Sequence, residues 1–181
     1  TNLLRHMIPV TPASVFLGFI LFLVVVWFLR RPMSARARRA APGQFVQLSK
    51  GIVHYQWHVP ENGPVLVMVH GLTTPSFVWR DQLSALTGAG HRVLTFDHFG
   101  RGFSDRPYAT YDMAFYVREI DELLEKLAVP AGFNLLGYSM GGGIAAHYAA
   151  LRRDRINRLI LLAPAGLLNA QPNWIARWPV I

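Results

Sequence analysis

The chain has 181 residues, enough for one sizeable core, and 52% of them are hydrophobic, which exceeds what an ordinary soluble domain needs. Eighteen Lys and Arg against ten Asp and Glu give it a net charge of +8. The sequence contains no cysteine, which excludes disulfides, thiolate metal sites and a cysteine nucleophile.

The positive charge is concentrated near one end of the chain. From Ala40 onward, twelve basic residues accompany all ten acidic ones, which leaves a net charge of +2. Binding of DNA or RNA needs basic residues spread over a folded face, so this distribution argues against a nucleic-acid partner. The other six basic residues flank a single apolar stretch: Arg5 before it, and Arg30, Arg31, Arg36, Arg38 and Arg39 after it.

That apolar stretch predicts a transmembrane helix. Residues 7–29 carry no charge and are almost continuously apolar from Ala13, with Thr11 and Pro12 suited to the N-cap and the first helical position. At ~1.5 Å per residue, a helix from Pro12 to Leu29 spans about the ~30 Å of a bilayer core. The sequence therefore indicates a lipid bilayer as a partner.

The arginines after this helix predict a single-pass membrane protein in which the part of the chain after the helix faces the cytoplasm, because basic residues favour that side. A cleaved signal peptide and a buried core helix are the alternatives, and Ala35-Arg36-Ala37 loosely imitates a cleavage site. A signal peptide, however, carries its positive charge before the apolar region. Residues 30–43 read as a juxtamembrane linker, either a topological signal only or also a contact for anionic headgroups.

Beyond the linker, short β-branched runs alternate with helical periodicity, which predicts an α/β fold with a mostly parallel open sheet and helices on both faces. A hairpin turned by Lys50-Gly51 opens it, and buried strands follow. The helix expected at 113–127 has an apolar face, and Glu119 lies among the acidic residues largely off that face. The expected strands are 45–48, 52–59, 65–69, 93–96, 133–137 and 159–162, and the expected helices are about 76–87, 113–127 and 140–152.

A serine flanked by glycines stands between an expected strand and an expected helix. The sequence Gly137-Tyr138-Ser139-Met140-Gly141 matches the Gly-x-Ser-x-Gly nucleophile elbow in its strand-turn-helix context. A serine held in a strained turn brings backbone too close for side chains two positions before and after it. Gly137 and Gly141 meet this demand, so we identify Ser139 as the candidate nucleophile; an idle serine in a glycine-rich loop is the alternative.

Gly142 and Gly143 extend the glycine run into the helix, where each costs ~1 kcal/mol relative to alanine. That cost makes sense if the N-terminus of the helix packs closely under the elbow. Its N–H groups and dipole could then stabilise an oxyanion.

His70 and Gly71 stand at the end of the strand expected at 65–69, directly after its last residue. The loop there must supply a second oxyanion donor. The backbone N–H groups of Leu72 and Met140 are the candidate pair. We expect His70 itself to have a structural role and not to be the catalytic base.

Other polar residues are assigned structural roles. Asp97, which begins a glycine-containing turn at 97–105, is expected to hydrogen-bond the loop backbone. His54 and His58 share one face of a strand but lack carboxylate or cysteine companions, so neither a metal nor a cofactor is expected. His147 lies about 12 Å along the helix from Ser139 and cannot reach it.

Four motifs in order, HG, DHFGRGFSD, GYSMGG and LLAPAG, resemble the α/β-hydrolase superfamily over about residues 45–166. The resemblance is closest to the serine esterases, monoacylglycerol lipases and carbon–carbon bond hydrolases of its lid-bearing branch. The serine at the elbow argues against epoxide hydrolases and haloalkane dehalogenases, which place Asp there. An apolar anchor before such a domain is similar to membrane-bound monoacylglycerol lipases.

The resemblance implies a triad in the order Ser, Asp or Glu, then His. No carboxylate occurs after Asp154, so the acid and the histidine are expected beyond Ile181. Without them Ser139 is a poor nucleophile, and the 181 residues alone are expected to be inactive. Residues 167–181 resemble the start of a lid, with a partly disordered end as the alternative.

The expected organisation is an N-terminal tail and transmembrane helix (1–29), an Arg-rich linker (30–43), the N-terminal part of an incomplete α/β-hydrolase sheet (44–166) and a truncated lid (167–181). The function expected is a membrane-anchored serine hydrolase that cleaves carboxylic esters of lipid-like substrates. The alternative is a non-catalytic, membrane-tethered binding protein that keeps the elbow as a scaffold.

Overall fold

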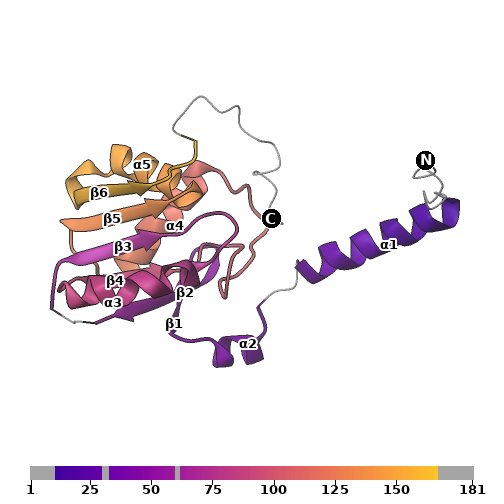
Figure 1. Ribbon diagram of the computed structural model, residues 1–181, viewed down its shortest axis with the longest axis horizontal. Coiled ribbons are helices and arrows are strands. Elements are labelled where there is room, and N and C mark those ends of the chain that lie inside the picture. Colours follow the sequence, from indigo (N-terminus) through magenta and orange to yellow (C-terminus); the bar gives the residue numbers. More distant parts are fainter. Residues whose placement is uncertain (1–10, 30–32, 60–61, 167–181) are drawn as a thin grey trace, which may run out of the picture. The chain divides into compact units, whose positions relative to one another are not determined.

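The computed structural model describes residues 11–29, 33–59 and 62–166, without the side chains of residues 26–29 (Figure 1). The chain divides after Arg31 into two compact units, which are described separately. Residues 167–181, the expected lid segment, lie outside the described residues.

In the first unit the structure describes residues 11–29, which contain the helix α1 (Pro12–Leu29). Its start is fixed by two hydrogen bonds, in which Ser14 N–H donates to Thr11 Oγ1 and Thr11 N–H donates to Ser14 Oγ. The expected helix is thus present, and its 18 residues rise about 27 Å. Among the helices of the described residues, none has the combination of length and apolarity that crossing a membrane requires. The expectation of a transmembrane span is therefore not supported.

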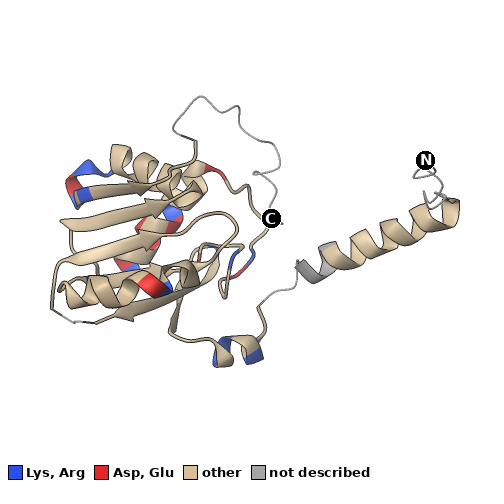
Figure 2. Ribbon diagram, in the orientation of Figure 1, with Lys and Arg blue, Asp and Glu red and all other residues tan. Residues whose placement is uncertain are grey.

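The second unit opens with a short helix that the sequence did not predict. Within the expected linker, α2 (Ala35–Ala40) forms, and Ser34 Oγ caps it by accepting the N–H of Ala37. Arg38 of α2 forms an ion pair with Asp105 and lies 5.8 Å above the ring of Phe45. The arginines of α2 are coloured blue in Figure 2, and through Arg38 this part of the Arg-rich linker is bound to the rest of the folded unit.

Six strands form one mixed sheet in the order β1-β2-β4-β3-β5-β6. The first two strands make the expected hairpin, β2 pairs with β4 antiparallel, and β4, β3, β5 and β6 run parallel. The predicted mostly parallel sheet is confirmed. The strands are β1 (Gln44–Leu48), β2 (Gly51–His58), β3 (Val65–Val69), β4 (Arg92–Phe96), β5 (Phe133–Tyr138) and β6 (Ile156–Leu162).

Helices cover both faces of the sheet (Figure 1). On β3, Val65, Val67 and Val69 pack with α4 and α5, whereas Leu66 and Met68 pack with η1 and α3 on the other face. This alternation explains why the whole of β3 is buried and apolar. The helices are η1 (Ser76–Trp79), α3 (Arg80–Gly88), α4 (Met113–Lys126), α5 (Met140–Leu151) and η2 (Arg153–Arg155).

Two burial predictions were wrong. The strand expected to be buried at 159–162 belongs to β6, which is largely exposed because within the described residues it pairs only with β5, at the sheet edge. Glu119, placed off the apolar face of α4, is 2% exposed. It lies one helical turn from both Tyr116 and Leu123, which are buried, so it shares their face.

Candidate active site

The candidate site lies at the carboxyl edge of the parallel strands. Because β4, β3 and β5 are neighbours and run parallel, the loops that begin at Asp97, His70 and Ser139 emerge side by side. A side chain built on Gly71 would place its Cβ 3.3 Å from the Cβ of Ser139. The loop expected to donate to an oxyanion therefore passes close to the candidate nucleophile.

Ser139 occupies a strained backbone conformation, with φ of +53° and ψ of −120°. Such a conformation costs about 1–3 kcal/mol and persists only where the surroundings enforce it. Here the N–H of Ser139 donates to Leu162 O, and its carbonyl accepts the N–H groups of Gly142 and Ala165. The residue is half-buried in the described structure.

The glycines around Ser139 are required by close backbone approach. A Cβ on Gly137 would lie 2.3 Å from the carbonyl oxygen of Gly141. A Cβ on Gly141 would lie 2.2 Å from Val69 O and 2.4 Å from His70 O. Gly142 and Gly143 lie equally close to the loop after β6. A Cβ on Gly142 would lie 2.8 Å from Pro164 Cα, and one on Gly143 would lie 2.4 Å from Ala165 O. The close packing inferred from the glycine run is confirmed.

The N–H of Leu72 is one of the two candidate oxyanion donors, and a hydrogen bond to the carbonyl of the same peptide group holds this peptide plane in place. His70 Nδ1 donates to the carbonyl oxygen of Gly71 at 2.6 Å. That carbonyl and the N–H of Leu72 belong to one planar trans peptide and point in opposite directions. The other donor, Met140, is the first residue of α5, where backbone N–H groups have no partner within the helix. The role of this pair stays a prediction.

His70 uses both of its ring nitrogens within these loops. Besides the bond from Nδ1 to Gly71, Nε2 accepts the backbone N–H of His98 at 2.9 Å. Burial, aided by the neighbouring His98, lowers the pKa of His70 to about 3, so the ring is neutral. Because both ring nitrogens of His70 are already hydrogen-bonded, neither is free to accept a proton from Ser139. This agrees with the structural role expected for His70.

Asp97 organises the turn that follows β4. Its carboxylate accepts the backbone N–H groups of Ser76 and Phe103 and contacts Nδ1 of His54 at 2.9 Å. Burial raises the pKa of Asp97, but these hydrogen bonds outweigh it and hold the pKa below its ordinary value. Nε2 of His54 bonds the carbonyl of Pro42. The predicted hydrogen bonding of Asp97 to loop backbone is confirmed, and His54 is its unforeseen partner.

Glu119 of α4 and His98 form a buried pair behind this edge. Glu119 Oε2 lies 2.5 Å from His98 Nδ1, and Oε1 accepts the N–H of Phe99. Burial raises the pKa of Glu119 to about 8 and lowers the pKa of His98 to about 3. Both pKa shifts favour the neutral forms of the two side chains, in which the carboxyl group of Glu119 can donate its proton to Nδ1 of His98.

Replacing Glu119 with Gln is expected to stabilise the protein relative to the wild type by an amount that grows as the pH rises. The growth should run from about pH 4.3, the ordinary pKa of glutamate, to about pH 8. In this window the folded state keeps a proton that the unfolded state releases, so the wild-type protein loses stability as the pH rises. Gln preserves the shape and both hydrogen bonds but does not titrate. Urea unfolding at the two ends of the window measures the difference. A difference that stays constant or shrinks as the pH rises would contradict a neutral Glu119.

Neither His58 nor His147 completes a catalytic site with Ser139. His147 is exposed on α5, as expected. His58 lies 3.0 Å from Thr95 Oγ1. Within residues 11–29, 33–59 and 62–166, no three His, Cys, Asp or Glu side chains form a group that could hold a metal ion. The expected acid and histidine beyond Ile181 stay predictions.

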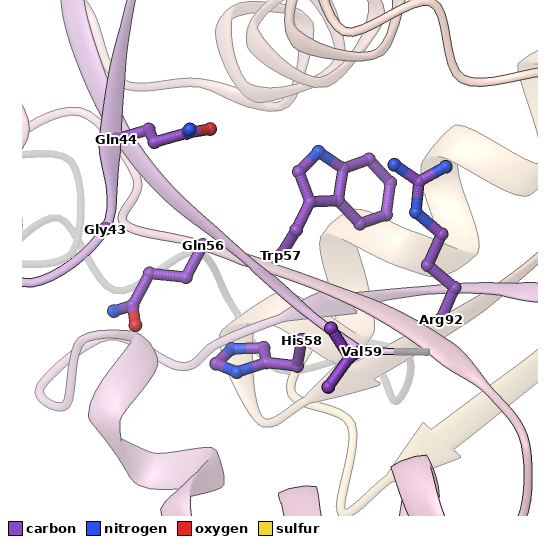
Figure 3. Close-up of a pocket in the computed structure, with 7 residues that line it drawn as sticks. All are labelled: Gly43, Gln44, Gln56, Trp57, His58, Val59 and Arg92. Atoms are coloured by element: carbon purple, nitrogen blue, oxygen red, sulfur yellow. The ribbon is translucent and has the colours of Figure 1, made fainter. Parts of the chain in front are cut away.

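A pocket of about 520 Å³ lies away from these loops, between the opening hairpin and the start of β4 (Figure 3). The guanidinium of Arg92 lies 4.1 Å from the centre of the Trp57 ring at its wall. None of its lining residues belongs to the elbow or to the loop after β3. The lining residues are Gly43, Gln44, Gln56, Trp57, His58, Val59 and Arg92.

Known proteins resemble this chain in sequence and in structure. A haloalkane dehalogenase of Mycolicibacterium paratuberculosis is 35% identical over 60% of the chain and 36% of its own length. Monoacylglycerol lipase abhd6-B of Xenopus laevis is 27% identical over 80% of the chain and 42% of its own length. The solved structure of an esterase from Exiguobacterium antarcticum superposes with a TM-score of 0.65 at 28% identity, covering 75% of the chain and 50% of the esterase.

The chain thus spans half or less of the length of each of these relatives. The model of one protein family, described as the alpha/beta hydrolase fold, matches residues 64–180. This match includes β3, β4 and β5 together with the elbow and the three loops at the carboxyl edge. The chain therefore belongs to the α/β-hydrolase fold family.

Proposed function

We propose that this chain is part of a serine hydrolase that cleaves carboxylic esters, with Ser139 as the nucleophile. The observation that carries the proposal is the backbone of Ser139, which has a positive φ and lies between glycines at positions where a Cβ would clash with neighbouring backbone. Strain of this kind at a half-exposed serine is a feature of nucleophile elbows. The esterase and the lipase among the relatives support the same reaction class.

In the proposed reaction, Ser139 Oγ attacks the ester carbonyl carbon while a histidine takes its proton. The N–H groups of Leu72 and Met140 stabilise the negative charge that develops on the carbonyl oxygen. The alcohol leaves with that proton, and water then hydrolyses the acyl-enzyme. We place the histidine and its acid partner in chain that follows Ile181, because His147 is the sole histidine after Ser139 in the sequence and faces solvent.

Esters with a lipid-like acyl group are the substrates proposed. The match to the monoacylglycerol lipase extends over 80% of the chain, further than the 60% matched by the haloalkane dehalogenase. Dehalogenases and epoxide hydrolases of this superfamily place Asp at the elbow, whereas this chain has Ser139. A serine forms an ester with an acyl group, which suits carboxylic esters.

Substrate profiling of the full-length protein tests the reaction class. We expect turnover of monoacylglycerols and p-nitrophenyl acyl esters, and no release of halide from haloalkanes or of diol from epoxides. Turnover of haloalkanes or epoxides but not of esters would refute the proposal. Hydrolysis of acetyl esters only would keep the reaction class and reject the lipid-like substrate.

Attachment to a membrane through α1 is a further part of the proposal. Ten apolar side chains between Val15 and Val25 are between 41% and 68% exposed, and they leave no polar face on the helix. A helix that is apolar all round is stable where it is surrounded by apolar groups, such as lipid chains. The Arg-rich stretch that follows favours the cytoplasmic leaflet, which carries anionic lipids.

Deleting residues 1–31 from the full-length protein is expected to move it from the membrane pellet to the soluble fraction. The hydrophobic clusters of the second unit consist of residues from that unit, so ester hydrolysis should persist. Fractionation with a carbonate wash, followed by an activity assay, measures both. Full-length protein that is already soluble would contradict attachment without affecting the proposed reaction.

A further inference from the structure

Arg101 reaches from the turn after β4 to the loop after β3. Its Nε donates to the carbonyl oxygen of Leu72 at 2.6 Å, and Nη1 donates to the carbonyl of Gly100 at 3.0 Å. The side chain is buried, with 9% of its surface exposed. This contact joins two segments 29 residues apart, and one of them carries a candidate oxyanion donor.

Both peptide groups that border Leu72 are held by side chains. His70 binds the carbonyl of the preceding peptide, and Arg101 binds the carbonyl of the following one. Because each peptide is planar, fixing the two carbonyls limits rotation about the backbone bonds of Leu72. The direction of the Leu72 N–H is therefore set by an imidazole on one side and a guanidinium on the other.

Within the part of the chain that the structure describes, Arg101 forms no ion pair with a carboxylate. Burial lowers the pKa of Arg101, but a guanidinium still remains protonated in proteins. A buried cation bound to carbonyl oxygens is expensive to desolvate, and its retention beside the loop calls for a function. A positive charge near a developing oxyanion stabilises it.

We propose that Arg101 is a positioning residue that aims the N–H of Leu72 at the oxyanion of the reacting ester. The inference rests on the proposed function, because it assigns the orientation of a donor in that same site. Arg101 acts through the backbone of Leu72 and makes no contact with substrate.

Arg101→Met in the full-length protein tests this role. Removal of an oxyanion donor lowers kcat by about 10²–10³-fold, so misdirecting one should lower kcat by about 10–100-fold. KM should change by less than about threefold, because the donor acts mainly in the transition state. Arg101→Lys keeps the charge and one donor, and should recover part of the loss.

Arg106→Met is the matched control. Arg106 is a half-buried arginine directly after the same turn, and its guanidinium donates to the carbonyls of Ser104 and Gly102 at 3.5 and 3.4 Å. The Arg106→Met variant loses one positive charge and exchanges the same pair of side chains as Arg101→Met, but it removes no contact to the loop after β3. We expect its kcat to match that of the wild type.

A trifluoromethyl ketone analogue separates positioning from general destabilisation, because it adds to Ser139 and places an oxyanion in the site. Its Ki should rise in proportion to the loss of kcat in Arg101→Met and Arg101→Lys. If Arg101→Met does not fold, the lysine variant alone decides. Wild-type kcat in the folded variant, or a fall in kcat without a rise in Ki, would overturn the inference. An inactive wild-type protein would instead refute the proposed function.

Discussion

Replacing Ser139 with Ala in the full-length protein is expected to lower kcat for ester hydrolysis by about 10⁶-fold. Alanine has no hydroxyl to attack the carbonyl, and the oxyanion donors alone retain only a small part of the rate enhancement. The fold should persist, because the hydrogen bonds that hold residue 139 come from its backbone. Steady-state kinetics together with thermal unfolding measure both expectations.

Ser84→Ala provides the matched control for this change. Ser84 is an exposed serine of α3, which covers the opposite face of the sheet from α4 and α5. Its substitution should leave kcat unchanged and shift stability by no more than about 0.5 kcal/mol. Retention of more than about 1% of the wild-type rate in the Ser139 variant would show that another residue is the nucleophile.

Replacing Gly141 with Ala is expected to lower the free energy of unfolding by about 3 kcal/mol, at the upper end of what overpacking costs. The added methyl group would lie 2.2 Å from Val69 O and 2.4 Å from His70 O, and both oxygens belong to backbone that cannot rotate away. The helix must then move away from β3 and carry the elbow with it. Denaturant unfolding measures the loss, and activity should fall with it.

Gly88→Ala tests whether the close approach, and not the loss of glycine, causes this effect. Gly88 is the last residue of α3, and a Cβ there would meet nothing within 4 Å. Alanine is the better helix former by about 1 kcal/mol, so the control should be neutral or slightly stabilising. Equal destabilisation of the two variants would contradict the account of the elbow.

Local patterns were sufficient to predict the sheet and the elbow. Continuous apolar runs identified β3 and β5, because strands covered on both faces need no polar residues. Gly137 and Gly141 marked the close approach around Ser139, because few other arrangements require glycine at both positions. Each of these features depends on residues within a few positions of one another.

Contacts between distant residues were beyond such patterns. Neither the pairing of His54 with Asp97 nor that of Glu119 with His98 leaves a periodic signal, because each joins segments tens of residues apart. Glu119 was misplaced because a carboxyl group normally avoids burial, whereas here burial raises its pKa and favours the neutral form. The hydrogen bond from Arg101 to the carbonyl of Leu72 likewise depends on the pairing of β3 with β4, which local sequence does not reveal.

The most direct test of the central claim is labelling of the full-length protein with a fluorophosphonate probe, followed by mapping of the modified peptide. Ester-cleaving serine chemistry at the elbow predicts one adduct, on Ser139, that is absent from Ser139→Ala and is suppressed by a competing monoacylglycerol. Equal labelling of the wild type and the variant, or no adduct in either, would contradict it and favour a protein that keeps the elbow only as a scaffold.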